Sequence, residues 1–106
     1  MSSDKTAGYA LTPQAQADLE QIWRYTAETW SIRQADKYIR DLATAFKLIV
    51  SMPLIARERT EFTPPVRIHL HESHLIIYVL RDPKVEILRI LGGQQDWMSI
   101  LNDAEP

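Results

Sequence analysis

The sequence contains no cysteine and only three glycines among its 106 residues. Without cysteine the chain cannot form disulfides, thiolate metal sites or a cysteine nucleophile, and this composition fits a reducing compartment. The few glycines form no glycine-rich phosphate-binding loop, and no His-Glu-x-x-His zinc motif occurs. These absences exclude several classes of enzyme before any helix or strand is assigned.

Long apolar segments are missing as well. The longest apolar run, residues 75–80, is far shorter than the roughly 20 residues that a membrane-spanning helix needs. The chain begins Met-Ser-Ser-Asp-Lys-Thr, which has no apolar signal core. We therefore expect a cytoplasmic protein with no membrane partner.

The chain also lacks a basic excess, since 12 Lys and Arg are set against 14 Asp and Glu, for a net charge of −2. Proteins that bind nucleic acid usually carry an excess of positive charge, because contacts to phosphates supply much of the affinity. We expect no direct, tight binding of nucleic acid. The length predicts one domain over residues 1–106, with residues 1–7 disordered and residues 102–106 forming a polar tail.

Two segments with helical periodicity follow the N-terminus. Thr12-Pro13 supplies the residue types preferred at an N-cap and at the first helical position, and Ser31 to Gln34 has the pattern of a capping box. Pro53 ends the second helix, because it restricts the preceding residue to extended geometry. The short link predicts an antiparallel helical hairpin over residues 13–51. Its predicted inner face consists of Leu19, Ile22, Thr26, Tyr38, Leu42, Phe46 and Ile49.

Strands are predicted on both sides of this hairpin, at residues 8–11, 66–71, 75–81 and 86–91, the last one opening at Lys84. Residues 52–65 show no period and are expected to be a loop with at most one helical turn. Asp96 is expected to cap a short final helix. The order β-α-α-β-β-β-α predicts an α+β, two-layer domain in which the hairpin packs on a mostly antiparallel sheet.

Period-two alternation predicts which side chains share a face of this sheet. In the last strand Val85, Ile87 and Leu91 are expected on one face together with Arg89, and Leu88 and Ile90 on the other. In the first long strand the residues predicted to lie on a partly open face, away from the hairpin, are Arg67, His69 and His71. Arg89 is either paired with a buried carboxylate or part of a recognition surface.

Three histidines are the only candidates for chemistry. His69 and His71 share a strand face, and His74 follows in the adjacent turn. They could supply part of a metal-binding site, but such a site needs three or four ligands. They could also act in acid–base chemistry, because histidine titrates near neutral pH. No motif supplies a nucleophile beside them. We therefore expect no catalytic residue, no metal site and no cofactor, and we interpret the histidines as solvated strand residues.

The order of short motifs along the chain resembles the ParE branch of the RelE/ParE toxin superfamily. The resemblance covers residues 9 to about 101. The matching segments are Leu11–Leu19, Ile22–Thr26, Trp30-Ser31, Gln34–Ile39, Pro53–Arg59, Ser73–Tyr78, Glu86–Leu91 and Asp96-Trp97. It implies the same β-α-α-β-β-β-α fold and a toxin of a bacterial type II toxin–antitoxin pair. ParE members inhibit DNA gyrase and are neutralised by a ParD-like antitoxin, whereas RelE members cut mRNA on the ribosome.

The chain departs from this pattern after the last strand. Where many members have His-Gly-Arg-Arg-Asp, this chain has Gly92-Gly93-Gln94-Gln95-Asp96, so one histidine and two cations are missing. Val79 stands where members commonly have arginine, and Ala56 where they often have glycine. These losses weaken the ribonuclease interpretation and favour inhibition by binding rather than catalysis. A degenerate, non-toxic antitoxin-binding module is a further alternative.

Two sets of residues are the candidates for these contacts. Helical aromatics are more often core than interface, but a domain of this size has little core in which to hide them all. The candidates for antitoxin binding are Trp23, Trp30, Tyr38, Arg57 and Arg59, because aromatic anchors and cations are common at such interfaces. The candidates for target binding are Arg67, Arg89, Gln94, Gln95 and Trp97.

Overall fold

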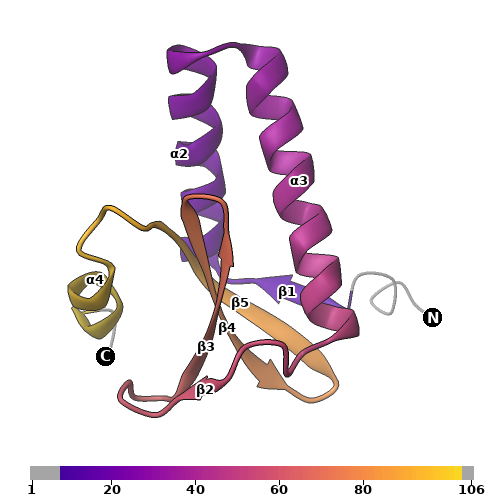
Figure 1. Ribbon diagram of the computed structural model, residues 1–106, viewed down its shortest axis with the longest axis vertical. Coiled ribbons are helices and arrows are strands. Elements are labelled where there is room, and N and C mark those ends of the chain that lie inside the picture. Colours follow the sequence, from indigo (N-terminus) through magenta and orange to yellow (C-terminus); the bar gives the residue numbers. More distant parts are fainter. Residues whose placement is uncertain (1–7, 104–106) are drawn as a thin grey trace.

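The computed structural model describes residues 8–103 and contains a helical hairpin, a five-stranded sheet and a short final helix (Figure 1). The elements, in chain order, are β1 (Tyr9–Leu11), α2 (Pro13–Thr29), α3 (Ile32–Ser51), β2 (Glu58–Arg59), β3 (Val66–His71), β4 (His74–Arg81), β5 (Lys84–Gly92) and α4 (Trp97–Asp103). The disorder expected for residues 1–7 lies outside the described residues, as does the end of the expected polar tail, whose first two residues, 102 and 103, belong to α4.

The two helices begin where their caps predict. The Thr12 hydroxyl accepts a hydrogen bond from Ala15 N, and Pro13 occupies the first turn of α2. Ser31 Oγ accepts in the same way from Gln34 N at the start of α3. The hairpin predicted over residues 13–51 is confirmed, and Figure 1 shows its tip rising well beyond the sheet.

The sheet has the order β1-β5-β4-β3-β2, with β1 parallel to β5 and all other pairs antiparallel. This confirms the α+β prediction and the mostly antiparallel sheet. β5 lies between β1 and β4, as its apolar sequence indicates. The loop of residues 52–65 differs from the expectation, because it contains the two-residue strand β2 and no helical turn.

The main core lies between the hairpin and one sheet face. Its fully buried side chains include Leu42, Phe46 and Ile49 of α3, Ile76 and Tyr78 of β4, and Ile87 of β5. Leu19, Ile22 and Tyr38 are partly buried against this cluster. The predicted inner face of the hairpin therefore packs on the sheet, most deeply toward the end of α3.

The second sheet face is not the open polar face that the sequence predicts. Arg67 and His69 lie opposite Tyr78 and Ile76, two residues of the main core, so their side chains are on the hairpin side. His71 likewise faces Tyr38 of α3, at 5.7 Å between ring centroids. The second face instead carries an apolar cluster that α4 and the loop before β3 cover. The buried members of this cluster are Phe62, Val66, Ile77, Leu91 and Leu101.

A bulge in β5 overturns the alternation expected there. Tyr78 pairs with Ile87, whereas the preceding residue, Ile77, pairs with Arg89, so Leu88 is an extra residue. Such a bulge shifts every later side chain to the other face. Ile87 and Ile90 accordingly both lie in the main core, whereas Leu88 and Leu91 join the opposite cluster.

Candidate functional site

A groove of about 750 Å³ lies between the hairpin and the end of the sheet. α2 and α3 form one wall, the β3–β4 turn forms the second, and the end of β5 with the turn after it closes the third. The lining residues on the helices are Asp18, Gln21, Ile22, Tyr25, Thr26, Trp30, Gln34 and Tyr38. Those on the sheet side are Glu72, Ser73, His74 and residues 89–95.

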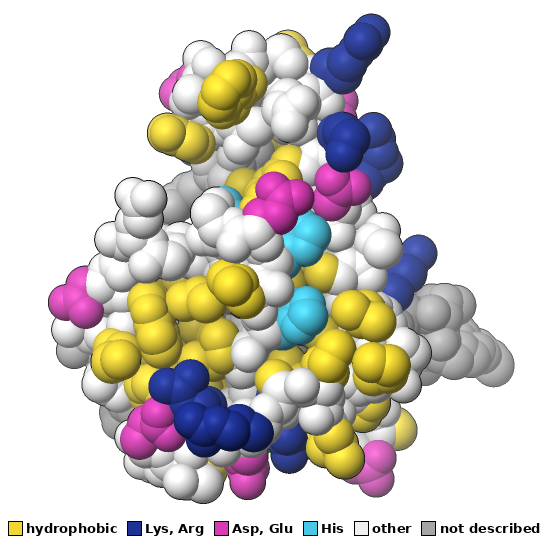
Figure 2. All heavy atoms as spheres, viewed as in Figure 1, with side chains coloured by type: hydrophobic (Ala, Val, Ile, Leu, Met, Phe, Trp, Pro, Cys, Tyr) yellow, Lys and Arg dark blue, Asp and Glu magenta, His cyan; other side chains and the backbone are white. Residues whose placement is uncertain are grey.

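Large aromatic side chains line the outer end of this groove. Trp30, the C-cap residue of α2, is 75% exposed, and Tyr25, which lies one turn earlier, is 67% exposed. Ile32, just after the helical link, is 63% exposed and extends the apolar surface of the hairpin tip. Figure 2 shows hydrophobic side chains gathered at this tip. Exposed apolar clusters of this kind mark surfaces that bind a partner.

A buried ion pair forms part of the groove wall. Asp18 is 8% exposed, and its carboxylate accepts hydrogen bonds from Arg89 Nε at 2.8 Å, Arg89 Nη2 at 3.0 Å and Ile90 N at 2.9 Å. The hydrogen bond to Asp18 raises the pKa of Arg89, whose charge is therefore kept. Of the two alternatives for Arg89, the structure shows the arginine paired with a carboxylate.

Tyr38 occupies the seam between α3 and the sheet. Its hydroxyl lies 2.7 Å from His74 Nδ1, and its ring lies 5.4 Å from the His74 ring. Burial raises the pKa of Tyr38, and the charge of Glu72 adds to this effect. Burial lowers the pKa of His74, and the neighbouring His71 lowers it further. Figure 2 shows histidine and acidic side chains together where the hairpin meets the sheet.

The glutamines that replace the basic motif lie in the turn after β5. Gln94 and Gln95 both line the groove. The Gln95 side chain accepts a hydrogen bond from Gly92 N, and Gly93 N donates to Ser73 O at 2.8 Å. This turn is therefore held against the β3–β4 turn and carries no positive charge into the groove.

Trp23 lies on the hairpin but does not line the groove. Its indole Nε1 donates a hydrogen bond to Asp36 Oδ1 at 2.9 Å and so links α2 to α3. The indole is partly buried, which gives Trp23 a structural role in joining the two helices. Antitoxin contact by Trp23 stays a prediction.

The remaining predicted site residues lie elsewhere. The Arg59 guanidinium pairs with Glu61 and lies 5.8 Å from the Phe62 ring centroid and 5.9 Å from that of Trp97. Arg67 donates to Ala56 O at 2.7 Å and so holds the loop after α3. Arg57, in the same loop, is exposed. Arg57, Arg59, Arg67 and Trp97 are therefore separate from the groove.

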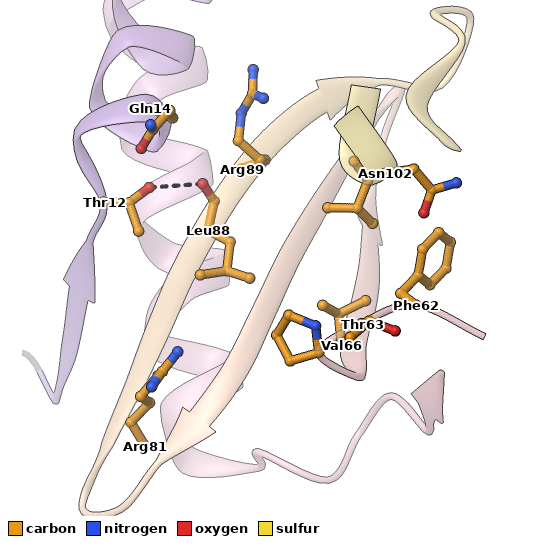
Figure 3. Close-up of a pocket in the computed structure, with 11 residues that line it drawn as sticks. Thr12, Gln14, Phe62, Thr63, Val66, Arg81, Leu88, Arg89 and Asn102 are labelled. Carbon is orange, nitrogen blue, oxygen red and sulfur yellow. Dashed lines mark hydrogen bonds between the residues drawn. The ribbon is translucent and has the colours of Figure 1, made fainter. Parts of the chain in front are cut away.

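A smaller hollow of about 240 Å³ lies on the opposite side of β5. Figure 3 shows Leu88 and Arg89 on β5, Arg81 at the end of β4, and Phe62 and Val66 on the facing side. The Thr12 hydroxyl, which donates to Leu88 O at 2.7 Å, closes one edge. Arg89 is the one arginine that lines both hollows, but its guanidinium is bound to Asp18.

Positive charge is scarce in the groove lining. His74 and Tyr38 could exchange a proton, but Arg89 is the only Lys or Arg among the described residues that line the groove. Because Arg89 is bound to Asp18, no cation remains there to stabilise a developing phosphoryl charge. Within residues 8–103 no group of three His, Asp or Glu side chains is placed to hold a metal ion, and no helix is long and apolar enough to cross a membrane.

Residues predicted for two different contacts meet in this groove. Trp30 and Tyr38, predicted to bind the antitoxin, and Arg89, Gln94 and Gln95, predicted to bind the target, all line it, and both sets of contacts stay predictions. Sequence reasoning missed Tyr25, which lines the groove together with Trp30. It also missed His74, which is identifiable only once the β3–β4 turn is folded beside α3.

Comparisons with known proteins agree on one family. Residues 9–97 match the model of the ParE toxin of type II toxin–antitoxin systems. A Mycobacterium tuberculosis protein named toxin ParE1 is 35% identical over 89 residues, which are 83% of this chain and 91% of that protein. An Escherichia coli protein named toxin ParE is 30% identical over 97 residues, or 90% and 93% of the two chains. A solved chain from the chromosomal ParDE system of P. aeruginosa shares the fold, with a TM-score of 0.70 and 22% identity over 80% of this chain and 94% of that one.

Proposed function

Because the chain belongs to the ParE toxin family of type II toxin–antitoxin systems, we propose that it inhibits DNA gyrase by binding, and that a ParD-like antitoxin neutralises it by docking in the groove. The proposed site of action is the cytoplasm, where gyrase and chromosomal DNA are found. The proposed mechanism requires no catalytic group and no cofactor. The single domain over residues 1–106 is sufficient for both contacts.

The aromatic groove is the observation that carries the antitoxin part of this proposal. Its outer end presents Trp30 and Tyr25, and its floor presents Tyr38 and Ile90. Large aromatic residues in a concave, water-excluding patch dominate the energetics of protein interfaces. A groove lined by aromatic and apolar side chains can bind an amphipathic helix, whose apolar stripe would face Trp30 and Tyr38.

The charges of the groove lining also suit an amphipathic helix of the antitoxin. The Asp18 and Arg89 charges in the groove wall cancel each other, and the amide side chains of Gln94 and Gln95 add none, so Glu72 leaves the described lining with a single negative charge. The partner segment therefore needs apolar and hydrogen-bonding side chains rather than a dense charge of either sign. Arg57 and Arg59 lie in and beside the loop after α3, where they would pair with antitoxin carboxylates and affect mainly the association rate.

The antitoxin contact is tested with variants of two exposed apolar residues, one inside the groove and one outside it. Trp30→Ala should weaken binding of the antitoxin encoded beside this toxin by at least about 1 kcal/mol, or roughly fivefold. Met98→Ala, an exposed apolar residue of α4 outside the groove, should leave the affinity unchanged. Calorimetry measures both, and circular dichroism confirms the fold of each variant. Unchanged affinity for Trp30→Ala and Tyr38→Ala together would place the antitoxin elsewhere.

The target is tested by supercoiling and cleavage assays with purified gyrase. The toxin should inhibit supercoiling and accumulate double-strand-broken DNA, and equimolar antitoxin should reverse both effects. In cells, expression of the toxin alone should induce the DNA-damage response and filamentation. Halted translation with intact DNA and cut mRNA would instead establish the ribonuclease, and absence of toxicity would establish a non-toxic antitoxin-binding module.

A further inference from the structure

The seam between α3 and the sheet contains a compact cluster of titratable rings. His71 at the end of β3 and His74 at the start of β4 are cross-strand partners, so their side chains share a face. Both rings lie within 6 Å of the Tyr38 ring between centroids, at 5.7 and 5.4 Å. Tyr38 and His74 line the groove, whereas His71 lies behind them.

The 2.7 Å contact between Tyr38 and His74 has a preferred direction. Tyr38 keeps its proton, because burial raises the pKa of its hydroxyl. A neutral imidazole that carries its proton on Nε2 can accept a hydrogen bond from the Tyr38 hydroxyl at Nδ1. A charged imidazolium carries protons on both nitrogens and cannot accept, so the Tyr38 hydroxyl would have to turn away.

On these grounds we propose that His74 is a positioning residue for the groove: as a neutral acceptor it holds the Tyr38 hydroxyl in place for the antitoxin, and protonation of its ring weakens antitoxin binding. The inference rests on the proposed docking of the antitoxin in this groove. His74 acts through Tyr38 and is not assigned any chemistry of its own.

The surroundings of His74 disfavour its charged form. Burial is the main cause of its lowered pKa, and His71 is the second. His71 Nε2 is itself buried and has no hydrogen-bond partner within residues 8–103.

Few charged groups near the Tyr38–His74 contact act against this preference for the neutral His74 ring. Glu72 in the β3–β4 turn favours protonation of His74 but does not outweigh burial. Asp41 of α3 acts on Tyr38, where it disfavours the phenolate. The end of β5, which lies opposite His74, contributes Gly92 and the uncharged residues of the following turn.

An antitoxin helix bound in the groove would make the protonation of His74 more costly. A helix lying over Tyr38 would cover His74, which is only partly buried in the free toxin, and would remove more water from its ring. Removal of water penalises the charged imidazole further, so the bound state prefers the neutral ring more strongly than the free state does. Protonation of His74 and binding of the antitoxin therefore oppose each other. At a pH below the pKa of His74 in both the free and the bound toxin, each unit by which binding lowers this pKa corresponds to a tenfold loss of affinity.

The first measurement uses the toxin alone. Long-range ¹H–¹⁵N spectra of the imidazoles at pH 7.5 should show His74 neutral, with its proton on Nε2 and Nδ1 free to accept. Tyr38→Phe should remove the hydrogen bond and alter the Nδ1 chemical shift of His74. A His74 ring that carries its proton on Nδ1, or that is charged at pH 7.5, would overturn the proposal.

The second measurement is the affinity for the ParD-like antitoxin encoded beside the toxin gene, at pH 7.5 and pH 5.5. The wild-type toxin should bind more weakly at pH 5.5 than at pH 7.5. His74→Asn supplies an amide oxygen near the position of Nδ1 and does not titrate, so it should bind as tightly as wild type at pH 7.5 and lose the pH dependence attributable to His74. His74→Phe, which cannot accept, should bind weakly at both pH values.

A neighbouring histidine provides the control. His69 lies on the same face two residues before His71, outside the groove, and burial also lowers its pKa. His69→Asn should keep the wild-type pH dependence of binding, because His69 does not contact Tyr38. An equal loss of affinity at pH 5.5 for wild type and His74→Asn would refute the inference and leave the proposed function intact. Absence of any antitoxin binding at pH 7.5 would refute the proposed function, and the inference with it.

Discussion

Replacing Asp18 with alanine should destabilise the protein strongly, because one carboxylate serves three donors. Arg89 Nε and Nη2 and the backbone N–H of Ile90 all bind it, and the Asp18 and Arg89 side chains are only 10% and 21% exposed. Breaking a buried pair by removing one partner costs about 3–5 kcal/mol. Since water reaches part of the Arg89 guanidinium, we expect a loss near the lower end, about 3 kcal/mol.

The contributions can be separated with three further variants. Asp18→Asn keeps an oxygen for Ile90 N but loses the charge, so it should cost less than Asp18→Ala. Arg89→Met leaves a carboxylate that is nearly buried and should cost about as much as Asp18→Ala. The double variant Asp18→Leu/Arg89→Met should be more stable than either Asp18→Ala or Arg89→Met, because apolar side chains of similar size replace both charges.

Urea unfolding at pH 7 measures these free energies, provided that each variant shows one transition with an unchanged dependence on urea. Asp41→Ala is the surface control, because the Lys37–Asp41 pair is exposed at 62% and 38% and should contribute no more than about 0.5 kcal/mol. A change within 0.5 kcal/mol for Asp18→Ala would refute the reasoning. So would a double variant Asp18→Leu/Arg89→Met that is no more stable than Arg89→Met alone, because it would show that the unpaired carboxylate carries no penalty.

Three other outcomes follow from the packing and the titrations. Leu42→Ala, at a fully buried position of α3, should cost about 2–5 kcal/mol in urea unfolding, whereas Leu48→Ala on the exposed side of the same helix should cost much less. Burial lowers the pKa of His69 and His74 below 6.5, so the unfolded chain takes up protons first and thermal stability should fall as the pH drops below about 6.5; His69→Asn should reduce that slope. Purified toxin should leave ribosome-bound mRNA intact, because the groove offers no unpaired cation; codon-specific cleavage would contradict this.

The helical hairpin could be predicted almost to the residue, because its evidence is local. Thr12 and Ser31 are capping residues, Pro13 opens the first helix, and the apolar spacing defines one face. The three long strands were likewise predictable from alternation and from the turns between them. Each of these patterns involves residues close together in the chain.

The sheet faces were not predictable, because they depend on partners far away. No residue type marks Leu88 as the extra residue of a bulge, yet that bulge reverses the faces of Ile90 and Leu91. Pairing with β4 determines which sheet face His69 and His71 occupy. Alternation alone predicts that they share a face, but not which face it is. For the same reason the groove was foreseen as a set of aromatics on the hairpin, whereas its sheet-side wall appeared only in the structure.

The pairing of the first strand with the last has a consequence for synthesis. β1 lies parallel to β5, the Thr12 hydroxyl binds Leu88 O across 76 positions in the chain, and Asp18 binds Ile90 N across 72. A nascent chain that has not yet released β5 from the ribosome therefore lacks the neighbour of β1, the partner of Asp18 and one wall of the groove. Contacts so distant in sequence form late, and domains generally fold as units during synthesis. The fold, and with it the groove, is complete only after β5 has left the ribosome.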